Sequence, residues 1–153
     1  MSWSFVLPQF LVIILLIVAI DVIVRPPYLF HSILWGCAIY LLYSFSSRFL
    51  LTRAHRRGRQ LANRGQYQQA IAAFEKSYQF FSHYDWIDRY RYLTLMTPSA
   101  MSYWEMALIN IGYCYLQLGK KQKAREYFQR ALAQFPQSQL AKHNLRIVEA
   151  SEK

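Results

Sequence analysis

The sequence predicts an all-α protein in two parts, a pair of membrane-spanning helices in residues 1–50 and a helical domain in residues 51–153. Two apolar runs of membrane length fill the first part, separated by a pair of prolines. Almost all of the charge lies after residue 47, since only Asp21 and Arg25 carry charge before it. In the second part, apolar residues recur at the spacing that is typical of amphipathic helices.

The first apolar run, residues 5–24, matches the roughly 20 residues that a membrane helix needs. It is too long and too uniformly apolar for a signal peptide, and it has neither a basic start nor a small-residue cleavage site, so we expect it to be retained. Asp21 lies near its end. An ionisable residue in a span can belong to a proton path, but pairing with Arg25 at the membrane surface is the simpler expectation.

The second run, residues 28–47, follows Pro26 and Pro27, which end the first helix. Because the connection is so short, the two helices must be antiparallel. Small and polar residues share one face of the second run, at Ser32, Gly36 and Tyr40. Such a face favours packing against other membrane helices.

The formal net charge of +10 is concentrated in an arginine cluster directly after the second run. The cluster consists of Arg48, Arg53, Arg56, Arg57 and Arg59. Basic residues next to a span favour the cytoplasmic side and anionic lipid headgroups, so we expect membrane lipids and not nucleic acid as the partner of the cluster. Two spans then place both termini in the cytoplasm. We expect an integral membrane protein, of the bacterial inner membrane.

Residues 105–138 carry the pattern of two short helices joined by a turn. Gly112 and Ala124 are small where the helices approach closely, Gly119 suits the turn, and Pro136 ends the second helix. This pattern resembles the tetratricopeptide repeat (TPR) family, whose unit is a helix–turn–helix of about 34 residues.

A weaker copy of the pattern occupies residues 51–84, where Gly58, Gly65, Ala70 and Phe74 repeat the spacing. The resemblance is poorer there, because Arg57 stands where the family has a large apolar residue. Residues 139–150 have a narrow apolar stripe and a charged opposite face, which is typical of a capping helix at the end of a repeat array. We therefore expect about two repeats and one capping helix.

An aromatic-rich insert, residues 85–104, separates the two copies. Thr97 and Pro98 look like a helix cap and a first helical position, so the next helix is expected to start near residue 98. Two interpretations of the insert stay open. It is either a partner-binding or membrane-touching element, or a plug that covers core left open by so short an array.

The sequence contains no catalytic constellation, so we expect a protein that is not an enzyme and uses no cofactor or metal. The histidines are widely spaced, and Cys37 and Cys114 lack the spacing of a metal or redox site. No phosphate-binding loop or nucleophile motif is present in the sequence.

The TPR resemblance implies that the first helix of each repeat lines a groove that binds a protein or peptide partner. Carried onto this chain, the groove residues are His55, Arg59 and Asn63 in the first copy and Ile109, Tyr113, Leu116 and Gln117 in the second. An amphipathic segment with an acidic or polar edge would suit this set. The alternative is that the insert or the terminal helix covers the apolar members.

Two functions from different classes follow from the sequence. The first is a membrane-anchored TPR adaptor that docks a protein partner at the cytoplasmic face. The second is a structural subunit or assembly factor of a membrane complex, in which the hairpin packs against other transmembrane helices.

Overall fold

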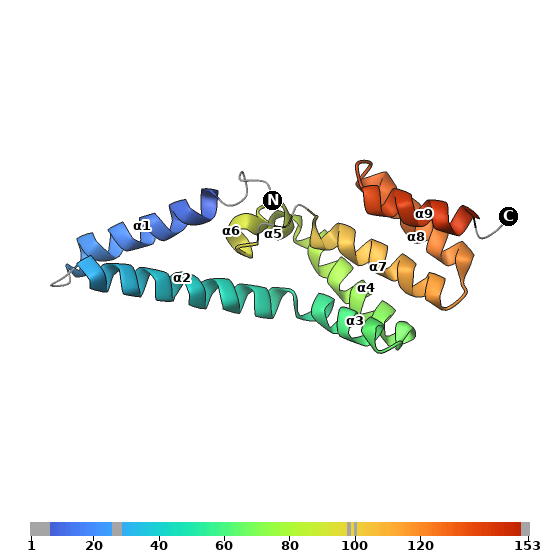
Figure 1. Ribbon diagram of the computed structural model, residues 1–153, viewed down its shortest axis with the longest axis horizontal. Coiled ribbons are helices and arrows are strands. Elements are labelled where there is room, and N and C mark those ends of the chain that lie inside the picture. The colour runs from blue at the N-terminus through green and yellow to red at the C-terminus, as the bar shows by residue number, and fades with distance from the viewer. Residues whose placement is uncertain (1–6, 26–28, 98, 100, 151–153) are drawn as a thin grey trace. The chain divides into compact units, whose positions relative to one another are not determined.

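The computed structural model describes residues 7–25, 29–97, 99 and 101–150, and in this part of the chain it is all-α, as the sequence predicts (Figure 1). The described helices are α1 (Leu7–Val24), α2 (Leu29–Leu51), α3 (Arg53–Asn63), α4 (Tyr67–His83), α5 (Asp85–Arg89), α6 (Arg91–Thr94), α7 (Tyr103–Gln117), α8 (Lys121–Gln134) and α9 (Gln139–Ala150). They divide into two compact units. The hairpin unit comprises Met1–Leu51 and Arg89–Ala100, and the repeat unit comprises Thr52–Asp88 and Met101–Lys153.

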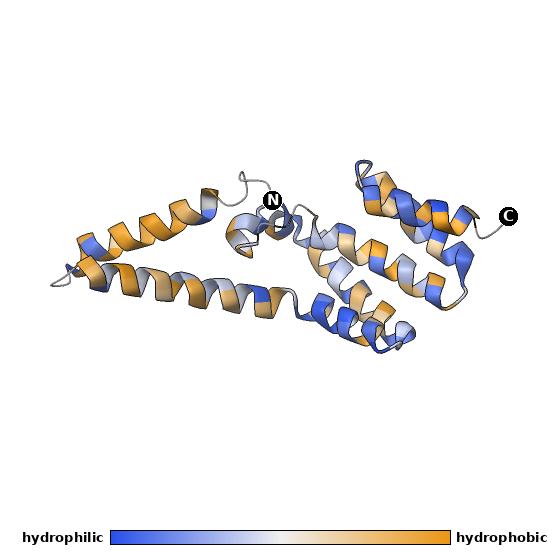
Figure 2. Ribbon diagram, viewed as in Figure 1, coloured by the Kyte–Doolittle hydropathy of each residue, from blue (hydrophilic) through white to orange (hydrophobic). Residues whose placement is uncertain are grey.

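Helices α1 and α2 form an antiparallel pair in the hairpin unit, and both are mostly hydrophobic (Figure 2). The small face of α2 is turned toward α1. A Cβ atom added to Gly36 would lie 2.7 Å from Cγ1 of Ile17, so glycine allows the close approach of the two helices. The Tyr40 hydroxyl donates to Oε1 of Gln9 at 3.4 Å. The small face of α2, which the sequence suggested for packing against helices of other proteins, therefore packs against α1.

Asp21 has a different partner from the expected one. The Ser32 hydroxyl donates to its Oδ1 at 2.9 Å, which joins the two helices near the turn. Arg25 has a φ of 46°, outside the helical region, because a residue before a proline is driven away from helical geometry. The expected pairing of Asp21 with Arg25 is therefore corrected to a bond across the hairpin.

The lengths of the two apolar helices differ from the predicted spans. Helix α2 runs through Leu51, four residues beyond the predicted end at 47, because nothing in Arg48–Leu51 breaks a helix. By length and composition, α2 is the one described helix that could cross a membrane, and the apolar stretch Gln9–Val24 is shorter. Residues 5, 6 and 28 of the predicted spans lie outside the described residues.

The repeat unit is built from two helical pairs and a final helix. Helix α4 packs against both α3 and α7, and α8 packs against both α7 and α9, so the helices stack in chain order. Each pair turns through a glycine in the left-handed region, Gly65 with a φ of 74° and Gly119 with a φ of 71°. The weaker copy of the pattern therefore uses the same turn as the stronger one.

The close contact inside each pair also rests on a glycine. A Cβ atom added to Gly58 would lie 2.7 Å from the Phe74 ring, and one added to Gly112 would lie 2.6 Å from the Phe128 ring. Glycine at these positions lets an aromatic ring of the second helix lie directly on the backbone of the first. Phe74 and Phe128 are fully buried as a result.

The start of α7 corrects the expectation drawn from Thr97 and Pro98. The helix begins at Tyr103, with Ser102 as the cap, and Pro98 lies outside the described residues. The Ser102 side chain accepts from the backbone N–H of Glu105 at 3.0 Å. Serine followed three residues later by glutamate is the sequence signature of a capping box, which here determines the start of the helix.

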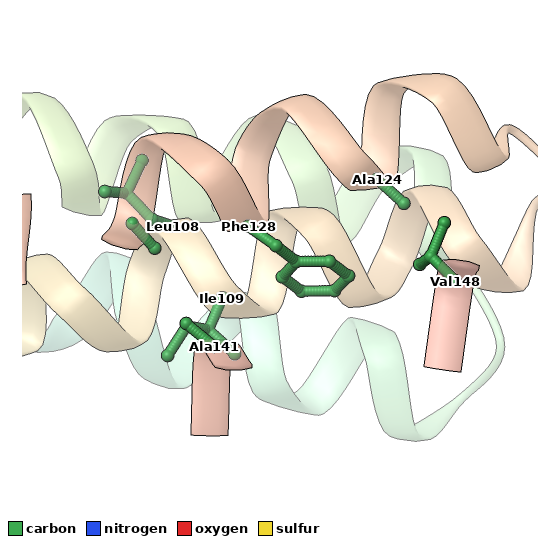
Figure 3. Close-up of a cluster of buried hydrophobic side chains, with 7 residues drawn as sticks. Leu108, Ile109, Ala124, Phe128, Ala141 and Val148 are labelled. Atoms are coloured by element: carbon green, nitrogen blue, oxygen red, sulfur yellow. The ribbon is translucent and has the colours of Figure 1, made fainter. Parts of the chain in front are cut away.

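The core of the second pair continues into α9. Figure 3 labels six side chains of this core, which come from α7, α8 and α9. They are Leu108, Ile109, Ala124, Phe128, Ala141 and Val148. The apolar stripe of α9 is therefore buried against the second helical pair, as a capping helix requires.

Candidate partner-binding surface

The groove residues predicted on α3 and α7 fall into two groups. Arg59, Asn63 and Gln117 are exposed, Tyr113 is 42% exposed, and Leu116 is half-buried against the core. His55 and Ile109 are buried and cannot reach a partner in this structure. Helices α3 and α7 contact each other, so the exposed members come from adjacent helices.

His55 is a core residue instead of a groove residue. Its ring meets the rings of Phe74 and Tyr103, with both centroid distances at 5.3 Å, and its Nδ1 lies 3.4 Å from the Ser77 hydroxyl. Burial, with a smaller contribution from the charge of Arg59, lowers the pKa of His55 to about 4. The histidine is therefore neutral at physiological pH and supplies no cation to a ligand.

Ile109 belongs to the same core cluster as Ala141 and Val148 of α9. The terminal helix α9 therefore covers Ile109, which is the alternative that the sequence left open for the apolar groove residues. A position in the repeat pattern indicates which helix face a residue occupies. It does not indicate whether a neighbouring helix covers that face.

Tyr113 is the aromatic member of the groove residues that remain exposed. Its ring meets the ring of Tyr67 edge-on, with the centroids 6.5 Å apart and the planes at 78°. Tyr67 begins α4 and was not among the predicted groove residues. We call Arg59, Asn63, Tyr113, Leu116 and Gln117 the docking surface. It combines an aromatic centre, one aliphatic side chain, one cation and two amides.

The arginine cluster is divided by the structure. Arg53, Arg56, Arg57 and Arg59 are exposed on α3, whereas Arg48 lies on α2 in the hairpin unit. The guanidinium of Arg48 donates from Nε to the Leu95 carbonyl at 2.8 Å and from Nη2 to the Met96 carbonyl. Arg48 therefore binds the polypeptide backbone, a role that sequence reasoning missed.

The aromatic insert is likewise divided. Residues 85–88 and 101–104 belong to the repeat unit, where Ile87 and Asp88 are buried. Residues 89–100 belong to the hairpin unit, where Leu95 and Met96 are buried. The carboxylate of Asp88 accepts from the backbone N–H groups of Tyr103 at 3.0 Å and Trp104 at 2.8 Å. No spacing pattern in the sequence indicates this contact of Asp88 with α7.

Two further titratable groups of the repeat unit, Cys114 and Tyr127, have shifted pKa values. Burial raises the pKa of the Cys114 thiol to about 11, which keeps it protonated at neutral pH. Burial and then the charge of Glu75 raise the pKa of Tyr127. Among the described residues, no group of three or more histidine, cysteine or acidic side chains is placed to hold a metal ion.

The family model of the tetratricopeptide repeat matches residues 106–138. In sequence, this segment is similar to a single tetratricopeptide repeat. The match covers α7, α8 and the turn at Gly119, which are the elements that show the glycine-to-phenylalanine contact described above. Comparison with curated proteins and with solved structures gave no match.

The match includes Tyr113. Tetratricopeptide repeats generally mediate interactions between proteins, and the match is consistent with a protein partner for this chain. The docking surface lies partly on the first helix of the matched repeat and partly on α3.

Proposed function

We propose that the chain is a membrane-anchored TPR adaptor, which holds a protein partner at the cytoplasmic face of the membrane. The observation that carries this proposal is a tetratricopeptide repeat in the same chain as α2, a helix long and apolar enough to cross a membrane. The hairpin unit would confine the repeat to the membrane, and the docking surface would select the partner.

The exposed side chains of α1 and α2 support anchoring in lipid. Large aliphatic and aromatic groups are exposed along both helices, and Leu42 of α2 is 70% exposed. Contiguous apolar surface of this extent is unfavourable in water, at about 25 cal/mol for each Å². In a bilayer, the same apolar surface contacts lipid acyl chains instead of water, and the helix bonds its own backbone polar groups internally.

The charge distribution supports the orientation. The exposed arginines of α3 follow α2 directly, whereas Arg25 alone precedes the second apolar helix within the loop. The positive-inside rule then favours a cytoplasmic repeat unit and two cytoplasmic termini. In this proposal the membrane is the bacterial inner membrane, and its anionic lipids attract the arginines of α3.

The docking surface favours an amphipathic partner segment. Tyr113 and Leu116 offer an apolar contact, and aromatic side chains are frequent anchors of protein interfaces. Arg59 and the amides of Asn63 and Gln117, exposed on α3 and α7, supply donors that suit an acidic or polar edge. The partner proposed here is therefore a protein segment with one apolar face and one acidic edge.

The alternative, a structural subunit whose hairpin packs against other spans, loses the observation that favoured it. Ser32, Gly36 and Tyr40 face α1 within the hairpin and contact Asp21, Ile17 and Gln9 respectively. The small face of α2 is therefore occupied by the chain itself. The adaptor remains the function that the geometry supports best.

The test compares two double variants of the full chain in affinity capture from membranes. Tyr113→Ala with Arg59→Ala should reduce capture of the partner at least tenfold, because it removes the aromatic anchor and the cation. The matched control is Tyr84→Ala with Arg57→Ala, since Tyr84 is 43% exposed and Arg57 is exposed on α3. Helical content by circular dichroism should be equal in both. Equal capture by both variants would show that the docking surface is not the binding site.

A further inference from the structure

Residues 90–97 form a short loop in the hairpin unit, which we call the α6 loop. It contains the single-turn helix α6, which contacts α1, and it is bonded to the C-terminal half of α2. The Tyr43 hydroxyl donates to the Thr94 carbonyl at 3.3 Å. Arg48 donates to the carbonyls of Leu95 and Met96. The loop is thus fixed to two points of α2 that are five residues apart.

These two points define where the loop lies along α2. A helix rises 1.5 Å for each residue, so Tyr43 and Arg48 are separated by roughly 7–8 Å along the axis. Arg48 is the first charged residue of α2, and Tyr43 directly follows the apolar pair Leu41 and Leu42. If α2 spans a membrane, this interval coincides with the boundary between acyl chains and headgroups, whose depth for interfacial segments is about 5–10 Å.

The backbone of the loop is satisfied by side chains. Carbonyl groups at the end of a helix have no partner within it, and α6 has only four residues. Three consecutive carbonyls, those of Thr94, Leu95 and Met96, accept from Tyr43 and Arg48. The Ser99 carbonyl accepts from Nε of Arg91 at 2.8 Å. Irregular backbone is tolerated near hydrocarbon only where its polar groups are bonded in this way.

The side chains of the loop point in two directions. Leu95 and Met96 are buried in the hairpin unit, whereas Tyr90 is 47% exposed and Leu93 is 37% exposed. An exposed tyrosine and leucine at the end of a membrane span match the amphipathic side chains that favour the membrane surface. The loop therefore keeps Tyr90 and Leu93 exposed while its backbone is bonded to α2.

From these observations we infer that the α6 loop is an interfacial element, whose Tyr90 and Leu93 side chains enter the headgroup–acyl boundary of the cytoplasmic leaflet. The inference rests on the proposed function, because it requires α2 to span the membrane. It adds a second lipid contact to the chain. The first helical pair is then joined to membrane-bound segments at both of its ends, after Leu51 and after Asp88.

The test measures the depth of nitroxide labels in vesicles of phosphatidylethanolamine and phosphatidylglycerol. Single cysteines are introduced by Leu93→Cys or Tyr90→Cys in the full chain with Cys37→Ala and Cys114→Ala. Leu42→Cys, on the exposed face of α2, reports whether the span is in lipid, and Gln68→Cys, exposed on α4, reports water. Collision with oxygen and with a water-soluble nickel chelate gives the depth of each label.

We expect the labels at residues 90 and 93 to lie at a depth between those at residues 42 and 68. If Leu42→Cys reads lipid while residues 90 and 93 read water, the inference is wrong and the membrane anchor stands. If residue 93 is shielded from both reagents, a protein covers the loop and the inference is also wrong. If Leu42→Cys itself reads water, the proposed anchor fails and the inference fails with it.

A second variant tests the role of Arg48. Arg48→Ala removes the donors to two carbonyls, so the label at residue 93 should become several-fold more accessible to the nickel chelate. Arg146→Ala, at an exposed arginine on α9 outside the arginine cluster, is the matched control and should leave that label unchanged. The label at residue 42 should read lipid in both variants. An unchanged label at residue 93 in Arg48→Ala would overturn the assignment of Arg48 as the residue that holds the loop.

Discussion

Single glycines determine how closely the helices of each pair approach. Gly58 and Gly112 leave room for the rings of Phe74 and Phe128, and both positions could be predicted because the repeat pattern calls for a small residue there. The burial of His55 could not be predicted in this way. The rings that cover it, Phe74 and Tyr103, come from two other helices, and a pattern within one helix carries no information about them.

The low pKa of His55 predicts a stability that depends on pH. Its pKa is about 4 in the folded chain, below the ordinary value of 6.5, so the unfolded chain binds more protons between these values. Stability is therefore fully present above pH 6.5 and is lost as the pH falls toward 4. Lowering the pH from 7.5 to 5 should cost about 2 kcal/mol through this residue, measured by urea unfolding in detergent.

The variant His55→Gln should flatten this part of the pH profile, although its overall stability will be lower. His143→Gln is the control, because His143 is exposed on α9. Identical pH profiles for His55→Gln and the unaltered chain would show that another group is responsible.

The start of α7 shows which of two capping signals in the sequence determines a helix boundary. Thr97 and Pro98 predict a helix start, yet α7 begins at Tyr103, where Ser102 and Glu105 form the pattern of a capping box. That signal was present in the sequence. The buried carboxylate of Asp88 also stabilises the start of α7, and the sequence could not predict this contact. Asp88 lies 15 and 16 positions before its two partners, and only the fold of the insert brings them together.

Asp88 should contribute measurably to the stability of α7. Asp88→Ala removes the acceptor of two backbone N–H groups at the helix start, where a carboxylate also interacts favourably with the helix dipole. The expected loss is about 1–3 kcal/mol of unfolding free energy. Hydrogen exchange at the amides of Tyr103 and Trp104 should accelerate.

Asp85→Ala is the matched control, since Asp85 is an exposed acidic residue of the same short helix. It should leave the exchange at Tyr103 and Trp104 unchanged. Equal effects of the two variants would indicate that helix α5, and not the carboxylate of Asp88, is what matters.

At the scale of the molecule, the uneven distribution of charge and apolar residues predicts two parts, and the structure has two compact units. Their composition differs from the expected one. Residues 89–100 belong to the hairpin unit, although they follow the first helical pair in sequence. Sequence order could not predict this, because the contacts of Leu95 and Met96 with Arg48 connect segments almost 50 residues apart.

The proposed topology predicts the behaviour of reporter fusions. Alkaline phosphatase, which is active only outside the cytoplasm, should be inactive when fused after Lys153 and active when fused after Arg25. The physical reason is the excess of arginines after α2 over the single arginine in the loop. Green fluorescent protein fused at the same two positions should give the reverse pattern. Phosphatase activity after Lys153 would contradict a cytoplasmic repeat unit.

Photocrosslinking at residue 113 tests the central claim, a protein partner held on the docking surface at the membrane. Benzoylphenylalanine is placed at Tyr113 or, as the matched control, at Tyr84 in the full chain, and intact cells are irradiated before the membranes are isolated. We expect a discrete protein adduct in the membrane fraction from residue 113, absent from residue 84 and lost with Arg59→Ala. No adduct from residue 113, or the same adducts from both positions, would contradict this claim.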